Sequence, residues 1–266
     1  MEIELPEEVS AIRDTVRKFV DRELIPREQD SMEGFDLKPA LRAELEKKAR
    51  DIGLWMLDVP EEYGGAGLSM LGRVIVWEEL ARTVALPPRG PAVFGPEAMP
   101  ILFMLNEEQK QRYLWPVLRG EKRAAFAQTE PDAGADPGSM RTTAVRDGDH
   151  YVINGMKRFI THAAESDFFQ LVAATDRSKG SRGGLSMFLV DRDAPGVKIL
   201  KAFPKMTGDQ TYQIAFDDVR VPVANRINEE GEGMRNAQGW LTAGRLRQSD
   251  RKSTRLNSSH GYISYA

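Results

Sequence analysis

The segment Phe126-Ala-Gln-Thr-Glu-Pro-Asp-Ala-Gly-Ala-Asp136 decides how the rest of the chain is interpreted. It begins in a short apolar run, residues 123–128, which predicts a β-strand. Pro131 and Gly134 then break the strand into a turn of small residues. Such a turn exposes backbone N–H groups, which can bind a phosphate or the polar edge of a flat cofactor. An ordinary junction between a strand and a loop is the alternative that composition alone leaves open.

The sequence before this segment predicts helices. Apolar residues recur there with the 3.6-residue period of an amphipathic helix, around residues 9–20, 41–52, 71–81, 95–105 and 106–118. Ser69 is an expected N-cap, and Asn106 with Gln109 has the spacing of a capping box. The glycine run at residues 64–67 lacks the spacing of a dinucleotide-binding loop, so it predicts a turn between helices.

From residue 123 onward the apolar period changes to two, which predicts strands at residues 123–128, 142–146, 151–153, 156–160, 168–174, 185–190, 197–200 and 212–221. Asp147-Gly148 and Asn154-Gly155 each predict a tight hairpin turn. Helices followed by strands predict an α+β fold. We expect an N-terminal all-α domain (residues 1–121) and a small β-barrel-like sheet domain (residues 122–230).

Helical periodicity returns after the predicted sheet, so residues 231–249 predict the start of a C-terminal helical domain. Residues 250–266 differ from everything before them. They are rich in Ser and Arg, lack any period, and resemble a translation of vector DNA. We interpret them as an artefactual tail and expect the chain to be a C-terminally truncated fragment.

The bulk composition excludes several kinds of partner and site. The chain of 266 residues has 37 lysines and arginines against 40 aspartates and glutamates, a net charge of −3. This balance gives no reason to expect a nucleic-acid partner. There is no cysteine, which excludes disulfides and thiolate nucleophiles. No apolar run is long enough to span a bilayer, so we expect a cytoplasmic protein, or a mitochondrial matrix protein after removal of a transit peptide.

Three motifs, in order along the chain, resemble the acyl-CoA dehydrogenase family. The first is Val59-Pro-Glu-Glu-Tyr-Gly-Gly-Ala-Gly67, and the second is the segment that contains Thr129-Glu130-Pro131. The third is Ile153-Asn-Gly-Met-Lys-Arg-Phe-Ile-Thr161. Three ordered motifs are far more specific than one.

The resemblance implies a function for the intact protein. Members of this family bind FAD and remove hydrogen from the α and β carbons of an acyl-CoA thioester. A glutamate takes the proton and the flavin accepts the hydride. The expected partners are an acyl-CoA substrate, electron-transferring flavoprotein or a similar acceptor, and further copies of the same chain. A neighbouring subunit would help to hold the adenosine end of FAD.

The matching positions imply which residues contact the cofactor: Phe126, Gln128, Thr129, Gly134, Ala135, Phe159, Ile160 and Thr161. Thr129 would bond to the flavin ring, and Phe159 would lie against it where the family usually has tryptophan. Ala135 replaces a serine that contacts cofactor or substrate, so a hydroxyl is lost. Arg245 would help to position the substrate and its pocket; a surface salt-bridge partner is the alternative that stays open.

No residue of the chain is predicted to be catalytic. Gly244 occupies the position just before Arg245 where a minority of the family has its base, and Glu230 and Glu232 flank a turn. The fragment itself is therefore expected to be inactive.

No metal site is predicted either. His150 and His162 lack nearby ligands. The carboxylates Glu130, Asp132 and Asp136 are interpreted as solvated or helix-capping acids.

Two other functions stay open. A flavin monooxygenase or oxidase of the same architecture would not need the glutamate base. A non-catalytic fragment that binds an acyl group or a protein partner would be favoured if the C-terminus is genuine.

Overall fold

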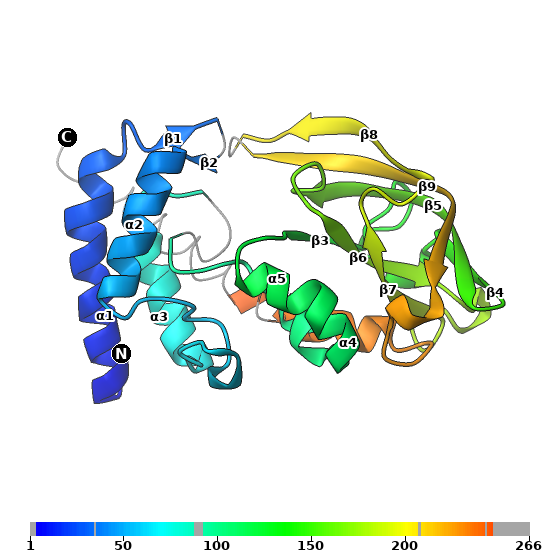
Figure 1. Ribbon diagram of the computed structural model, residues 1–266, viewed down its shortest axis with the longest axis horizontal. Coiled ribbons are helices and arrows are strands. Elements are labelled where there is room, and N and C mark those ends of the chain that lie inside the picture. The colour runs from blue at the N-terminus through cyan, green and yellow to red at the C-terminus, as the bar shows by residue number, and fades with distance from the viewer. Residues whose placement is uncertain (1–3, 35, 88–92, 207–208, 243, 247–266) are drawn as a thin grey trace. The chain divides into compact units, whose positions relative to one another are not determined.

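The computed structural model describes residues 4–34, 36–87, 93–206, 209–242 and 244–246 (Figure 1). The chain divides into two compact units, Met1–Glu97 with Leu241–Ala266, and Ala98–Trp240. The predicted tail, residues 250–266, lies outside the described residues. Among the helices that the structure describes, none is both long and apolar enough to cross a membrane.

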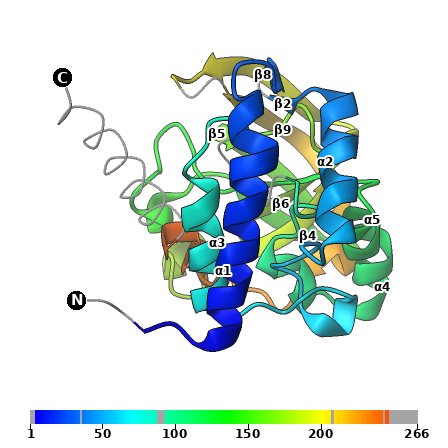
Figure 2. The ribbon, with the colours of Figure 1, turned by 90° about the vertical axis from the view of Figure 1, so that its left-hand side faces the viewer.

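The first unit is helical (Figures 1 and 2). Its elements are α1 (Glu7–Phe19), the π-helical turn η1 (Val20–Leu24), η2 (Ile25–Arg27), β1 (Met32–Glu33), β2 (Asp36–Leu37), α2 (Pro39–Asp51), η3 (Glu61–Tyr63) and α3 (Met70–Leu80). The apolar stripes of α1, α2 and α3 share one core, which includes Val16, Leu45 and Val76. The predicted helices at 9–20, 41–52 and 71–81 are thus confirmed.

Local signals set the ends of these elements as the sequence predicts. The Ser69 side chain accepts a hydrogen bond from Gly72 N at 3.2 Å and caps α3. The glycine run after η3 forms a turn between helices. A Cβ added at Gly65 would lie 2.0 Å from the Val59 carbonyl oxygen, so only glycine fits there.

The prediction of a helix over 95–105 is wrong in extent. The structure has only a 3₁₀ turn, η4 (Pro100–Met104), preceded by irregular backbone. Pro96 and Pro100 explain this, because each disfavours helical geometry in the residue before it. The capping box of Asn106 and Gln109 is confirmed and opens α4 (Glu107–Gln109), which continues through η5 (Lys110–Leu114) and α5 (Trp115–Leu118).

The second unit contains an eight-stranded sheet and, by its contacts, also α4 and α5. The strands are β3 (Ala124–Ala127), β4 (Thr143–Asp147), β5 (His150–Thr161), β6 (Phe168–Ala174), β7 (Leu185–Asp191), β8 (Val197–Pro204), β9 (Gln210–Pro222) and β10 (Arg226–Ile227). Short 3₁₀ turns are η6 (Pro137–Ser139), η7 (Arg177–Lys179) and η8 (Val223–Asn225). Gln109 links the helices to the sheet, since its Nε2 donates to the Ala224 and Arg226 carbonyls at 2.7 and 2.8 Å.

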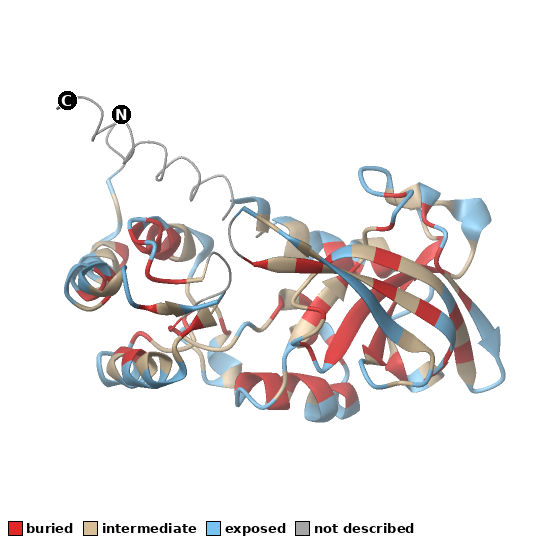
Figure 3. Ribbon diagram, turned by 90° about the horizontal axis from the view of Figure 1, so that it is seen from above, coloured by how far each residue is buried: buried red, intermediate tan, exposed pale blue. Residues whose placement is uncertain are grey.

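The strand order is β10-β7-β6-β4-β5-β9-β8, with β3 parallel to β6. β6 and β7 are almost continuously buried, whereas β8 is largely exposed (Figure 3). The α+β fold class is therefore as expected, and residues 233–242 and 244–246 are helical, as the predicted start of a C-terminal helical domain requires.

Asp147-Gly148 forms the predicted hairpin, in which β4 and β5 pair with Asp147 opposite His150. The predicted turn at Asn154-Gly155 is wrong, because β5 runs straight through it. Gly155 instead marks an irregularity in the pairing of β5 with β9. It has a φ of 149°, and an added Cβ would lie 2.5 Å from Thr142 Oγ1. The glycine serves a close approach of two segments, not a turn.

We expect Gly155→Ala to lower the free energy of unfolding by about 3 kcal/mol, from a strained backbone plus overpacking against Thr142. Gly148→Ala is the matched control, since Gly148 also has a positive φ (62°) but no atom within 4 Å of the added Cβ. The Gly148→Ala substitution should lower the free energy of unfolding by only about 1–2 kcal/mol. Urea denaturation measures both. Equal losses would show that the contact with Thr142 is unimportant.

Candidate cofactor site

The candidate site begins where β3 ends. Residues 124–127 pair in parallel with β6, and Gln128 and Thr129 follow directly. The backbone then turns, with the Glu130 amide donating to the Ala133 carbonyl at 2.9 Å. Gly134 lies beside Thr129, because a Cβ added to the glycine would be 4.0 Å from Thr129 Cγ2. Ala135 is exposed.

The second part of the site is a β-bulge in β5. Lys157 pairs with Ile214 and Ile160 with Tyr212, so Arg158 and Phe159 both face the single residue between them on β9. Phe159 takes a φ of 64°. A left-handed backbone at an aromatic residue is costly, and such strain is concentrated at functional sites. Bulges often redirect a side chain next to a binding site.

The bulge presents an aromatic ring to the surface. The Phe159 side chain is 55% exposed, and its ring contacts the Phe203 ring edge-on at 5.2 Å between centroids. Thr161, which ends β5, is half-buried. Ile160 is 2% exposed and belongs to the core of the sheet unit, so only its backbone could contact a ligand.

A backbone hydrogen bond joins the two parts of the site. The bulge frees the Arg158 amide from the ladder with β9, and this amide donates to the Thr129 carbonyl at 2.9 Å. Thr129 and Phe159, which the sequence places thirty residues apart, are therefore neighbours in space. The amide and the hydroxyl of Thr129 have no hydrogen-bond partner among the residues that the structure describes.

A buried ion pair, which no local sequence pattern indicates, lies behind this junction. Lys157 Nζ lies 2.8 Å from Glu130 Oε1, and the exposed fractions of the two side chains are 0% and 3%. The interpretation of Glu130 as a solvated or capping acid is therefore wrong. Asp136 does cap η6, by accepting from Gly138 N, and Asp132 forms an exposed pair with Arg141.

Burial and the charge of the partner shift the pKa values of Lys157 and Glu130 in opposite directions. Burial lowers the pKa of Lys157 to about 8, and Glu130 offsets only part of that effect. Burial alone would raise the pKa of Glu130, but the Lys157 charge and the hydrogen bonds from Lys157 and from the backbone together hold it below its ordinary value. The carboxylate is thus ionised at neutral pH, with the ammonium beside it.

An aromatic contact at Phe126 is a second feature that the sequence did not predict. The ring of Trp240 lies 4.5 Å from the Phe126 ring, and both side chains are half-buried. Trp240 comes from helical residues 233–242, far from β3 in the sequence, and no local pattern indicates the contact. Phe126 is thereby held by a neighbour on the segment that follows the sheet.

The residues present are compatible with a flavin. The buried Gln128 Oε1 has no partner among the described residues and could accept a hydrogen bond from the edge of the ring. Thr129 offers two donors, and Phe159 offers an exposed flat face. A separate cavity of about 590 Å³ lies beside the same turn, but none of Gln128, Thr129 and Phe159 lines it.

The described residues provide neither a metal site nor an evident base. No group of three or more His, Asp or Glu side chains that could hold a metal occurs within the described part of the chain. Glu230 accepts from the Tyr151 hydroxyl, and Glu232 pairs with Arg235 at 3.1 Å. Arg245 belongs to the other compact unit, so its predicted role in substrate binding stays a prediction.

Sequence models of the acyl-CoA dehydrogenase N-terminal domain and middle domain match residues 6–121 and 125–219. The short-chain specific acyl-CoA dehydrogenase of Clostridium acetobutylicum is 37% identical over 254 residues, which are 92% of this chain and 64% of that protein. The caffeyl-CoA reductase-Etf complex subunit CarC of Acetobacterium woodii is 38% identical over 90% of this chain and 63% of its own length.

A similar solved structure is that of a putative acyl-CoA dehydrogenase from Mycobacterium abscessus. It superposes with a TM-score of 0.80 and 30% identity, over 94% of this chain and 67% of that one. The chain spans somewhat less than two thirds of the length of the curated relatives given above. Both halves of the described fold match the same family, and the chain belongs to the acyl-CoA dehydrogenase family.

Proposed function

We propose that this chain carries the flavin-binding part of an FAD-dependent acyl-CoA dehydrogenase. The observation that carries the proposal is the junction of Thr129 with Phe159 through the 2.9 Å hydrogen bond from the Arg158 amide. It brings unpartnered polar groups next to an exposed aromatic ring. A flat heterocycle with a polar edge needs both.

The roles of the residues follow from their environments. Gln128 and Thr129 would hold the edge of the isoalloxazine ring, and Phe159 would cover one face. FAD, when bound, supplies the acceptor for a hydride from the β carbon of the acyl thioester. The Phe126 and Trp240 rings pack against each other at 4.5 Å, and they would provide an apolar surface beside Gln128. We assign no catalytic base among the described residues, and we expect the chain alone to be inactive.

The partners belong to the same proposal. The relative from Acetobacterium woodii is a subunit of a complex with Etf, which supports an electron-transferring flavoprotein as the acceptor of this protein. Dehydrogenases and a CoA-ester reductase both occur among the relatives, so the same site would serve either direction of an acyl-CoA/enoyl-CoA interconversion. Homo-oligomers and a mitochondrial or cytoplasmic location remain inferences from the family.

Titration of the purified chain with FAD, read by flavin fluorescence, tests the cofactor site. We expect weak, saturable binding. Thr129→Val should weaken it about two- to tenfold, since one hydrogen bond is lost. Phe159→Ala should weaken it about tenfold through loss of the ring contact. Val145→Ala is the control, because Val145 is also a large exposed side chain of the sheet (64%). If all three variants bind like the parent chain, the flavin does not bind here.

The substrate class is tested with the flavin bound. Butanoyl-CoA should perturb the visible spectrum of the flavin, whereas NADPH should leave it unchanged. Reduction of the flavin by NADPH, with no response to butanoyl-CoA, would instead indicate a monooxygenase of the same architecture. The reason is that a monooxygenase must take its electrons from an external reductant.

A further inference from the structure

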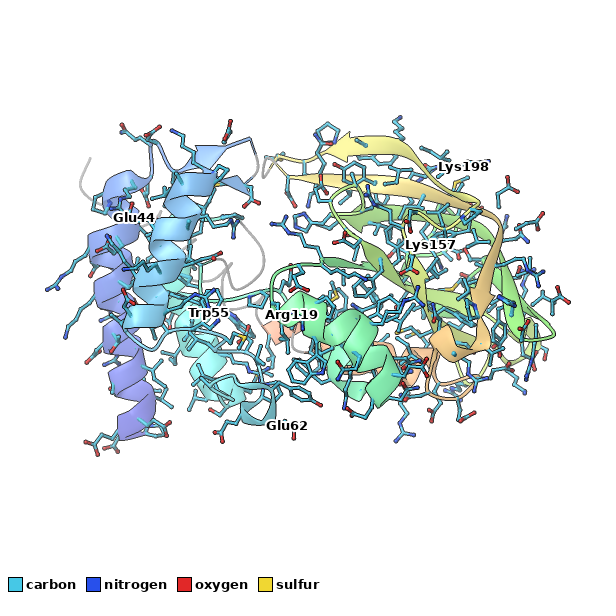
Figure 4. All side chains as sticks on the ribbon, in the orientation of Figure 1. Glu44, Trp55, Glu62, Arg119, Lys157 and Lys198 are labelled. Carbon is cyan, nitrogen blue, oxygen red and sulfur yellow. The ribbon has the colours of Figure 1, made fainter. Side chains whose placement is uncertain are left out.

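A lysine with no exposed surface lies directly behind the proposed flavin edge. Lys157 lies on β5 (Figure 4), and its side chain is fully buried. Its ammonium has three partners. It donates to Glu130 Oε1 at 2.8 Å, to the Gln128 carbonyl at 2.9 Å, and to Met140 Sδ at 3.2 Å. All three donors of the ammonium are therefore used inside the protein.

Glu130 extends the connection to a third segment. Its Oε2 accepts from the Arg141 amide at 2.6 Å, and its Oε1 accepts from the Thr142 amide at 3.0 Å. Thr142 leads into β4. One pair of side chains thus joins the turn after β3, the start of β4 and the middle of β5.

The partners of Lys157 enclose Thr129 from both sides in the sequence. The Lys157 ammonium donates to the carbonyl of Gln128, the residue before Thr129. The Arg158 amide donates to the carbonyl of Thr129 itself. The Lys157 ammonium also pairs with the carboxylate of Glu130, the residue after Thr129. The backbone around Thr129 has little freedom, while the Thr129 amide and hydroxyl stay available.

Stability alone does not account for a buried ion pair. Removing two charges from water costs several kcal/mol per ion, and apolar replacements of such pairs are often as stable or more stable. Gln128 and Thr129 need a fixed orientation if they are to bind the edge of a ring, because preorganised donors lose less entropy on binding.

We propose that Lys157 is a positioning residue for the flavin site. By binding the Gln128 carbonyl and the Glu130 carboxylate at once, it fixes the Gln128–Thr129 peptide in the conformation that meets the flavin edge. This inference rests on the proposed function. The inference goes beyond the proposed function because it assigns part of the affinity for FAD to a residue that does not contact the cofactor.

The test is a folded variant without the pair. Lys157→Met alone leaves the Glu130 carboxylate buried without its partner and should strongly lower the urea midpoint of unfolding. Adding Glu130→Gln removes that charge and keeps one oxygen, which can accept from either the Arg141 or the Thr142 amide; in the parent chain these amides bond to different oxygens of the carboxylate. We expect the double variant to recover most of the stability and native circular dichroism, yet to bind FAD at least tenfold more weakly.

The control is an ion pair in the helical unit whose carboxylate is buried to the same extent. Arg17 and Glu79 form an ion pair at 2.5 Å, and the Glu79 side chain is 2% exposed, much like that of Glu130. Unlike Lys157, Arg17 is 49% exposed, and Arg82 also pairs with Glu79 at 3.0 Å. The double variant Arg17→Met/Glu79→Gln should keep the parent affinity for FAD. A folded Lys157→Met/Glu130→Gln protein that binds FAD like the parent chain, with the same bound-flavin spectrum, would overturn the proposal.

Hydrogen exchange without FAD separates this inference from the proposed function. The Arg158 amide bonds to the Thr129 carbonyl, so its exchange reports whether the junction is held. We expect slow exchange in the parent chain and faster exchange in the double variant, with the control unchanged. Slow exchange in the double variant would overturn the positioning role. Absence of FAD binding by the parent chain would instead refute the proposed function.

Discussion

The buried ion pair of Lys157 and Glu130 is the constraint on which the candidate site depends. It connects the turn after β3, the start of β4 and the middle of β5, and each of its oxygens accepts at least one backbone or ammonium proton. A charge in such a place is tolerated only when it is fully paired. The course of the turn at residues 128–142 is therefore fixed by two side chains whose partners cannot be exchanged independently.

The bulge in β5 complements this constraint. Two residues of β5 face one residue of β9. The left-handed backbone at Phe159 is energetically unfavourable, and the strand pairing on both sides of the bulge stabilises it. His162, just beyond the strand, also has a positive φ, of 59°. The bulge leaves the Phe159 ring exposed and releases the Arg158 amide from the ladder, so that this amide donates to the Thr129 carbonyl instead. In the proposed site the ring would be the surface for a ligand, and the hydrogen bond holds Thr129 beside it.

Much of the fold could be predicted from local patterns. Ser69 and Asn106 predicted the starts of two helices, and Asp147-Gly148 predicted a hairpin. These predictions were possible because helix caps and tight turns involve residues within about four positions of one another. Asn154-Gly155 carries the same hairpin signal but lies within a strand. The reason for its glycine is the approach of Thr142, which no local pattern reveals.

The candidate site was predictable only in part, and for the same reason. Phe126, Thr129 and Phe159 were predicted as site residues through the resemblance to a family. The role of Glu130 depends on Lys157, which is twenty-seven residues away in the sequence. Glu130 is close in sequence to Asp132 and Asp136, and nothing in this acidic segment indicates that Glu130 alone is buried. Trp240 likewise reaches Phe126 only through the tertiary fold.

The most direct test of the central claim is a map of amide NMR shifts during titration of the isotope-labelled chain with FAD. If residues 128–130 and 158–161 form the flavin site, the largest shifts will fall on Thr129, Phe159 and Thr161, with smaller ones at Gly134 and Ala135. Shifts confined to other strands, or to the helical unit, would contradict the assignment of the site.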